Sequence, residues 1–163
     1  MPDTHESRRL IAYNQWADEK IMAAIKGMPD AELQASREAY FGSLAGNLRH
    51  TVGAQLVWLA RWKGEPTPPL DRLIAGPWPD VYAASHAALR AYVESLTDAD
   101  LARVVRYTDF KGVSRALALA PLITHLVNHG TQHRAETGLL LERMGRSPGD
   151  LDYLYFCYER AEA

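Results

Sequence analysis

The sequence feature that most constrains the fold is the segment from Leu117 to Gly145, which has the pattern of one long amphipathic helix. Pro121 suits the first turn of such a helix, where its missing N–H is not needed, and Gly145 suits the left-handed residue that ends it. Six residues of this segment recur at steps of three and four residues, or their sums, and therefore lie on one side of the helix. They are Leu122, Leu126, His129, His133, Leu140 and Met144. Two imidazoles therefore lie in the middle of the side that is expected to face the core, where each ring nitrogen needs a partner.

A metal ion is one partner that two imidazoles can share. A divalent transition metal binds imidazole nitrogen at roughly 2.0–2.1 Å, so two ligand nitrogens lie about 3–4 Å apart. Residues four apart rise about 6 Å along a helix, and rotatable side chains can close that gap, whereas His125 and His133 lie about 12 Å apart along the axis. The helix therefore offers either His125 with His129 or His129 with His133, and any further ligand must come from another helix. The alternative is a pair of core histidines that are hydrogen-bonded to buried polar groups.

Three further long helices are expected, each opened by a residue that can cap it. They run from 3 to about 26, from 44 to about 62 and from 80 to about 96, behind the caps Asp3, Ser43 and Asp80. Four such helices with polar groups converging inside predict an all-α fold, an up-and-down four-helix bundle, whose core is a usual place for a metal site. His86, on the apolar side of the third helix, has no second ligand three or four residues away, so we interpret it as a core or boundary histidine.

The connections between these helices carry the remaining signals. Residues 65–79 hold five of the nine prolines and are expected to form an irregular loop, in which Trp78 is a candidate for the roof of a pocket or a simple hydrophobic anchor. Residues 103–115 lose the helical period and predict a small hairpin or extended excursion before the last long helix. A terminal helix is expected from Leu151 onward.

Composition and charge limit the class of protein. The 163 residues, 47% of them hydrophobic, predict one domain spanning 1–163 with a core that needs no disulfide staples, and the single Cys157 excludes an internal disulfide. No window holds 18 consecutive apolar residues and the first ten residues lack an apolar signal core, so we expect a cytoplasmic protein without a membrane partner. The net charge of −2 and the scattered basic residues argue against nucleic-acid binding.

The run HLVNHGTQHRAE at 125–136 resembles the signature of the DinB/YfiT-like family, a bacterial superfamily of helical-bundle metalloproteins. That family usually reads His-hydrophobic-x-Asn-His-x-x-x-His-Arg-Gly-Gln, so Ala135 and Glu136 depart from it. Two further blocks carry the resemblance, AYNQWAD at 12–18 and FGSLAGNLRH at 41–50, the latter followed by VWLARW at 57–62.

The resemblance implies a metal site made of His129 and His133 together with His50 from the second helix. Periodicity alone does not direct His50 to the core, because its side of the helix is that of Asn47, Ala54, Val57 and Arg61, so its assignment comes from the resemblance. Asn14 can end in the site as a hydrogen-bonding group or be solvated.

Three neutral nitrogen ligands leave at least one position for water or substrate. Histidine-only sites suit zinc, nickel, iron or copper, and of these we expect zinc or nickel. Glu136, three residues after His133, can orient a ligand imidazole, transfer a proton or act as a fourth ligand, or it can form a salt bridge with Arg143. Arg134 faces away from the ligand side and is expected to form a structural ion pair.

Two functional hypotheses follow from the resemblance. Relatives include thiol S-transferases that use bacillithiol, a mycothiol-dependent isomerase and proteins described as metal-dependent hydrolases. They imply a metal-dependent enzyme that activates a low-molecular-weight thiol or a water for attack on a small electrophilic substrate. The second hypothesis is a non-catalytic, dimerising metal-binding bundle in stress response. Dimers are common among the relatives, so a homodimer is expected in either case.

Overall fold

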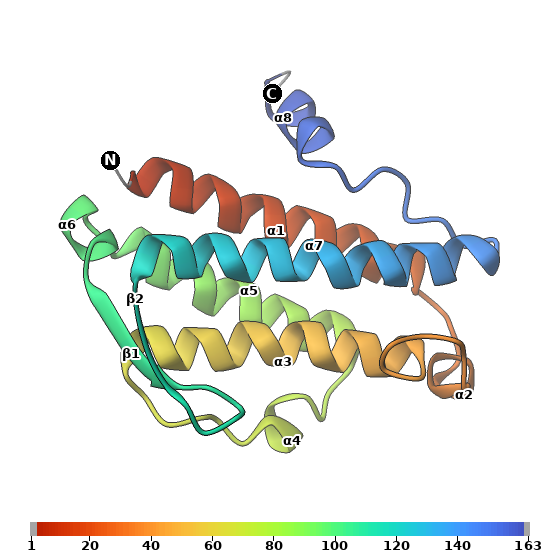
Figure 1. The fold of residues 1–163 in the computed structure, drawn as a ribbon. Helices are drawn as coiled ribbons and strands as arrows, with labels where there is room; N and C mark the ends of the chain where they lie inside the picture. The colour runs from red at the N-terminus through yellow and green to blue at the C-terminus, as the bar shows by residue number, and fades with distance from the viewer. Residues whose placement is uncertain (1–2, 162–163) are drawn as a thin grey trace.

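Four long helices lie along one another in the computed structural model, which describes residues 3–161 (Figure 1). They are α1 (Thr4–Ala24), α3 (Leu44–Lys63), α5 (Trp78–Glu94) and α7 (Leu119–Arg143). Helices α1 and α3 each pack against both α5 and α7, so α1 lies diagonally across from α3. The all-α four-helix bundle that the sequence predicts is therefore confirmed.

The directions of the helices refine the up-and-down prediction. Helices α3 and α5 run parallel, because their hydrogen-bonded pairs rise together along both chains: Tyr82 with Leu48, Ser85 with Gln55, and Tyr92 with Trp62. Helices α1 and α7 are also parallel, since Asn14 bonds Arg134 and Ala24 bonds Arg146. The order is up, down, down, up, and the connection 64–77 is long enough to return along the bundle (Figure 1).

Two of the three expected N-terminal caps are present, Asp3 on α1 and Ser43 on α3. The Ser43 side chain accepts from the Gly46 N–H at 3.0 Å, and α3 stops at Gly64, whose φ of 72° is readily adopted by glycine. The exception is α5, which begins at Trp78 behind an extended Pro77, so Asp80 lies in the first turn and does not cap the helix. Pro79 is tolerated there because the first N–H groups of a helix have no intrahelical acceptor.

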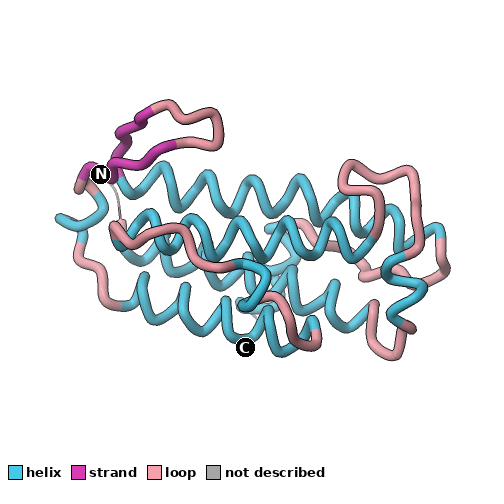
Figure 2. Tube along the Cα trace, turned by 90° about the horizontal axis from the view of Figure 1, so that it is seen from below, coloured by secondary structure: helices cyan, strands magenta, loops and turns pink. Residues whose placement is uncertain are grey.

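Short elements fill the connections. They are α2 (Asp30–Gln34), α4 (Leu70–Leu73), α6 (Asp98–Leu101), β1 (Val104–Thr108), β2 (Ser114–Ala118) and the terminal α8 (Tyr153–Ala161). Strands β1 and β2 form the predicted hairpin, with Val104 opposite Ala118. The hairpin stands beside one end of the bundle (Figure 2), where β1 packs against α3. None of the helices in the described part of the chain is long and apolar enough to span a bilayer.

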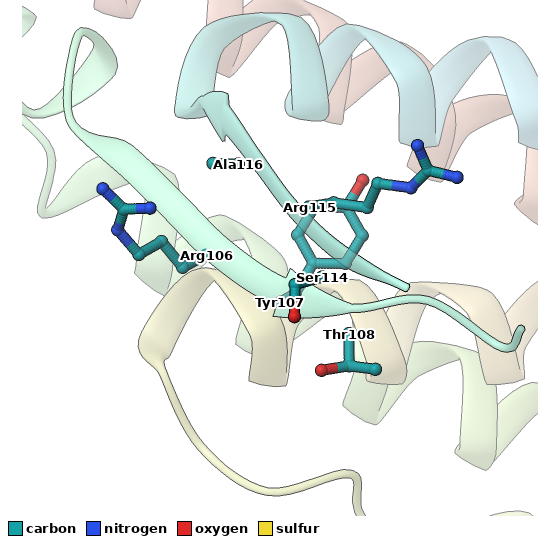
Figure 3. A pocket seen from close by; sticks show the side chains of 6 residues that line it. All are labelled: Arg106, Tyr107, Thr108, Ser114, Arg115 and Ala116. Carbon is teal, nitrogen blue, oxygen red and sulfur yellow. The ribbon is translucent and has the colours of Figure 1, made fainter. Parts of the chain in front are cut away.

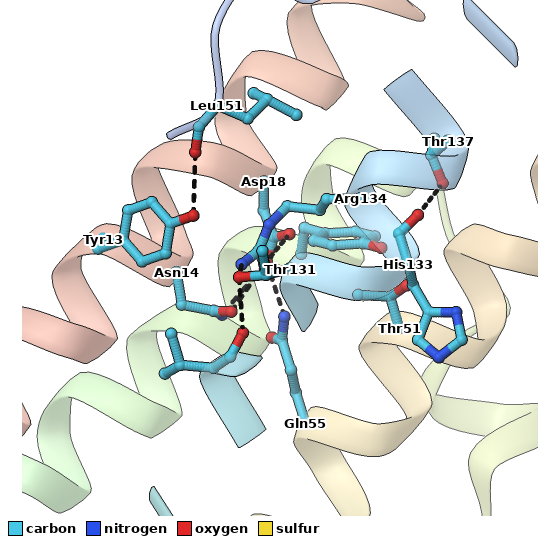
Figure 4. A network of polar contacts seen from close by, with 12 residues as sticks. Tyr13, Asn14, Asp18, Thr51, Gln55, Thr131, His133, Arg134, Thr137 and Leu151 are labelled. Atoms are coloured by element: carbon cyan, nitrogen blue, oxygen red, sulfur yellow. Dashed lines mark hydrogen bonds and ion pairs between the residues drawn. The ribbon is translucent and has the colours of Figure 1, made fainter. Parts of the chain in front are cut away.

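A buried polar network joins all four long helices. Figure 4 shows Asp18, Gln55 and Arg134 of this network. The centre of the network is Asp18, whose side chain is 1% exposed. One carboxylate oxygen accepts from Arg134 Nη1 at 3.0 Å, and the other accepts from Gln55 Nε2 at 2.7 Å and His86 Nε2 at 2.9 Å. Arg134 also donates to the Asn14 side-chain oxygen at 2.7 Å.

The network explains why a carboxylate can be charged in the core. Burial by itself would raise the pKa of Asp18, but the Arg134 guanidinium and His86 outweigh it and hold that pKa below its ordinary value. The predictions that Arg134 forms a structural ion pair and that His86 belongs to the core are both confirmed.

Candidate metal centre

Three imidazoles meet between α3 and α7. His50 comes from α3, and His129 and His133 come from α7. Each ring offers one nitrogen, and these three nitrogens all lie within 4.8 Å of one another. The Nε2 atoms of His50 and His129 are 3.0 Å apart. All three side chains are partly buried, so the cluster lies at the margin of the core and not at its centre.

The antiparallel packing of α3 on α7 brings His50 to the other two histidines. Asn47, one turn before His50, is buried and bonds Glu136 and Thr137 at 3.0 and 3.5 Å. This places His50 on the flank of the helix interface, which explains why the core stripe of α3 did not predict its direction. The spacing argument left two pairs open on α7, and the structure brings together the pair His129 and His133.

His125 lies outside the cluster. Its ring packs edge-on against Trp58 at a centroid distance of 5.1 Å and lies 5.8 Å from the His129 ring. Among residues 3–161, the histidine, cysteine and acidic side chains close enough to share one ion are His50, His129 and His133.

The segment before α3 forms one wall of the histidine cluster. The Phe41 ring stacks on the His50 ring, with centroids 3.9 Å apart and an interplanar angle of 20°. Glu136 holds this segment, because its carboxylate accepts from the Tyr40 backbone N–H at 2.6 Å and from Asn47 Nδ2 at 3.0 Å. Within residues 3–161, Glu136 forms no salt bridge with Arg143. It is also not a member of the histidine cluster. From these contacts we expect Glu136 to act as a positioning residue for the wall beside His50.

Replacing Glu136 with glutamine is expected to lower the free energy of unfolding by about 1–2 kcal/mol, because a glutamine oxygen can satisfy only part of the two donors. We expect zinc affinity to fall about tenfold as well, because a looser segment 40–41 holds the His50 ring less firmly and the groups that orient a ligand typically contribute that much. Urea unfolding and a zinc competition titration measure the two effects. Glu142→Gln, on an exposed part of the same helix, is the matched control, and equal behaviour of the two variants would contradict the positioning role.

The histidines are neutral at pH 7. Burial, followed by the charges of His133, His50 and His125, lowers the pKa of His129 to about 4. Burial also lowers the pKa of His50 and of His133, although Glu136 opposes the shift at His133. Neutral imidazoles offer free lone pairs, which is the protonation state that metal ligation requires. With two of the three nitrogens 3.0 Å apart and all three within 4.8 Å of one another, the donor set fits a divalent transition metal.

A cavity of about 680 Å³ adjoins the cluster, between α3, α7 and the hairpin. Two of the three histidines line it, His50 and His129, and most of the remaining wall is apolar or aromatic, with Phe41, Val57, Trp58, Leu70, Tyr107 and Phe110. Its size is within the range of small-molecule sites. A separate hollow of about 450 Å³ lies on the hairpin itself (Figure 3), and its lining residues include Arg106, Tyr107 and Arg115 but none of the histidines.

The other predicted site residues lie elsewhere. Asn14 is 1% exposed and belongs to the network around Asp18. Trp78 lines a different cavity of about 480 Å³, together with Met28 and Pro77. Sequence reasoning also missed Arg61 and Tyr107 as cavity residues. An aromatic residue in the predicted hairpin was the available signal, but the position of the hairpin against α3 could not be derived from periodicity.

Comparisons with known proteins give one family and one curated relative. A family model described as "DinB family" matches residues 1–162. The protein named "Protein DinB" from Bacillus subtilis (strain 168) is 24% identical to this chain over an alignment 173 positions long. The alignment covers 94% of this chain and 95% of the relative. The resemblance found in the histidine run therefore extends over nearly the whole sequence.

Proposed function

Because this chain belongs to the DinB family, we propose that it is a metal-dependent enzyme in which His50, His129 and His133 hold a divalent cation, zinc or nickel. One observation carries the proposal: the nitrogen cluster opens directly onto a cavity of about 680 Å³, which two of the three histidines line. A structural zinc site is closed by four protein ligands, whereas three ligands beside a cavity are typical of a catalytic one.

A bound cation of this kind lowers the pKa of a water to roughly 7 and deprotonates a thiol. The chain supplies the surroundings for such a nucleophile. The cavity wall beside the histidines is mostly apolar, and Phe41, in the segment that Glu136 holds, stacks on the His50 ring and fixes its orientation. The substrates that suit this site are a small electrophile and, for transfer chemistry, a low-molecular-weight thiol.

A second candidate is a metal-binding homodimer without turnover. The observation in its favour is an exposed apolar face on α8, where Leu154, Tyr155 and Tyr158 are 55%, 43% and 54% exposed. Such a face is typical of an interaction surface, although it is small for a stable dimer.

The test separates the two candidates. Untagged protein is stripped of metal, reloaded with zinc or nickel, and mixed with a thiol panel and a chloro- or epoxide-bearing acceptor, with product followed by mass spectrometry. We expect adduct only in the metal-loaded protein, and none with His50→Ala, whereas the exposed His5→Ala control stays active. Product formed without thiol would indicate hydrolysis. A metal-loaded protein that forms neither product would leave the binding role.

A further inference from the structure

A single arginine, Arg61, lies at the end of the cavity away from the cluster of His50, His129 and His133. The Arg61 guanidinium rests on three aromatic rings of the cavity wall, at 4.8 Å from the centroid of Trp58 and 4.9 Å from those of Tyr107 and Phe110. Its Nη2 donates to the Thr108 carbonyl at 3.1 Å. Contacts between a cation and ring faces leave the N–H groups at the edge of the guanidinium unused, so the side chain is fixed in place while donors remain.

The charge of Arg61 is not neutralised by an ion pair. No carboxylate of residues 3–161 forms a salt bridge with it. Asp109 is the acidic residue in the cavity wall, and both of its oxygens are engaged. One accepts from Arg115 Nε at 3.0 Å, and the other accepts from the backbone N–H groups of Lys111 and Val113, each at 2.9 Å. The second arginine of the wall, Arg49, lies near the histidines and pairs loosely with Asp71 at 3.8 Å.

The cavity thus has two chemically different ends. His50 and Arg61 are eleven residues apart on α3, which corresponds to roughly 16 Å along the axis. Between them the wall is small and apolar, with Gly53, Ala54 and Val57. A molecule that touches both ends therefore needs an extended apolar body.

We propose that Arg61 binds the anionic group of the substrate, so that the substrate is an amphipathic organic anion, a carboxylate or sulfonate whose apolar body extends toward His50 and His129. This inference rests on the proposed function, because the histidine centre is what makes the far end of the molecule reactive. Arg61 is a specificity-determining residue, since a neutral molecule of the same shape leaves its remaining donors unpaired.

The experiment uses two fluorescent probes with the same body, 8-anilinonaphthalene-1-sulfonate and the neutral N-phenyl-1-naphthylamine, titrated into the full-length metal-free protein. We expect one saturable site for the sulfonate. Arg61→Gln should weaken its binding roughly ten- to a hundredfold, the range for a hydrogen bond to a charged group. Binding of the neutral probe should change less than about twofold. Arg61→Lys, which keeps the charge, should be intermediate, and the exposed Arg143→Gln is the matched control.

Displacement of the bound sulfonate probe by aliphatic molecules tests how long the apolar body of the ligand must be. Decanoate should displace the sulfonate probe, whereas butyrate and decanol should not. The inference is overturned if Arg61→Gln weakens both probes equally, if it weakens neither, or if the wild-type protein has no saturable site. Should Arg61→Gln fail to fold by circular dichroism, Arg61→Lys and the decanoate–decanol comparison in the wild type decide the question. The probe titrations need no metal. If zinc failed to bind in a separate titration, the proposed function would be overturned, whereas the role of Arg61 in anion binding would still be decided by the probe titrations.

Discussion

Replacing His129 with alanine is expected to lower the affinity for zinc by at least about a hundredfold. Losing a partner behind a ligand already costs ten- to a hundredfold, and His129 is itself a donor in the cluster. Its Nε2 atom lies 3.0 Å from that of His50, and its low pKa, about 4, keeps the lone pair available well below neutral pH. A competition titration against a chromophoric chelator, with untagged protein, measures the affinity.

The matched control is His125→Ala, one turn earlier on the same helix. His125 borders the cavity and contacts Trp58, but it lies outside the nitrogen cluster, so its loss should change zinc affinity by no more than a few fold. A loss at His125 as large as that at His129, with His133→Ala unaffected, would mean that the ion binds one turn away from the cluster described above.

Replacing Asp18 with asparagine is expected to lower the free energy of unfolding by about 3–5 kcal/mol at pH 7, because it leaves a buried cation without its partner. Arg134 is 3% exposed, so water cannot replace the carboxylate at 3.0 Å from its Nη1. Urea unfolding measures the difference. Asp71→Asn, whose side chain is fully exposed, is the control and should shift stability by less than about 0.5 kcal/mol.

The stability difference between wild type and Asp18→Asn should depend on pH, and its direction follows from the pKa of Asp18. The pKa of Asp18 is lower in the folded protein than its ordinary value of 3.8, so the folded state binds fewer protons there than the unfolded state. The stability contributed by this carboxylate is therefore complete above that ordinary value and is lost as the pH falls through the lower, folded value. The gap between wild type and Asp18→Asn should narrow on the acid side of pH 3.8. A gap that stays constant down to the acid transition would contradict a charged Asp18 in the folded core.

Local rules predicted the helices well, because their signals are contained in short stretches. Capping by Ser43 and the stop at Gly64 depend on residues within a few positions of one another. The four-residue histidine spacing on α7 is also local, but it left two pairs open, and the family resemblance chose between them. His50 could not be derived in this way, since its direction depends on how α3 packs against a helix some eighty residues later. It was assigned from the family resemblance.

The cavity was beyond sequence reasoning for the same reason. Trp78 was expected near a pocket as an aromatic residue in a proline-rich loop, yet it lies at another cavity. It is also the first residue of α5, which begins three residues earlier than an Asp80 cap implies. Asn14, left open between site and solvent, is buried against Arg134. The Arg61 guanidinium contacts one ring on α3 and two rings on the hairpin. These contacts could not be predicted, because the position of the hairpin against α3 does not follow from periodicity.

The hairpin belongs to the connection between α6 and α7 and is a two-stranded sheet of its own, outside the four-helix framework. Phe110, between the two strands, is 87% exposed while still bordering the cavity. We expect insertions or exchanges at this tip to change the shape of the cavity mouth but not the histidine cluster, because the three imidazoles come from α3 and α7 and not from the hairpin. Exchanges at the hairpin tip would therefore vary the proposed substrate preference separately from the histidine cluster.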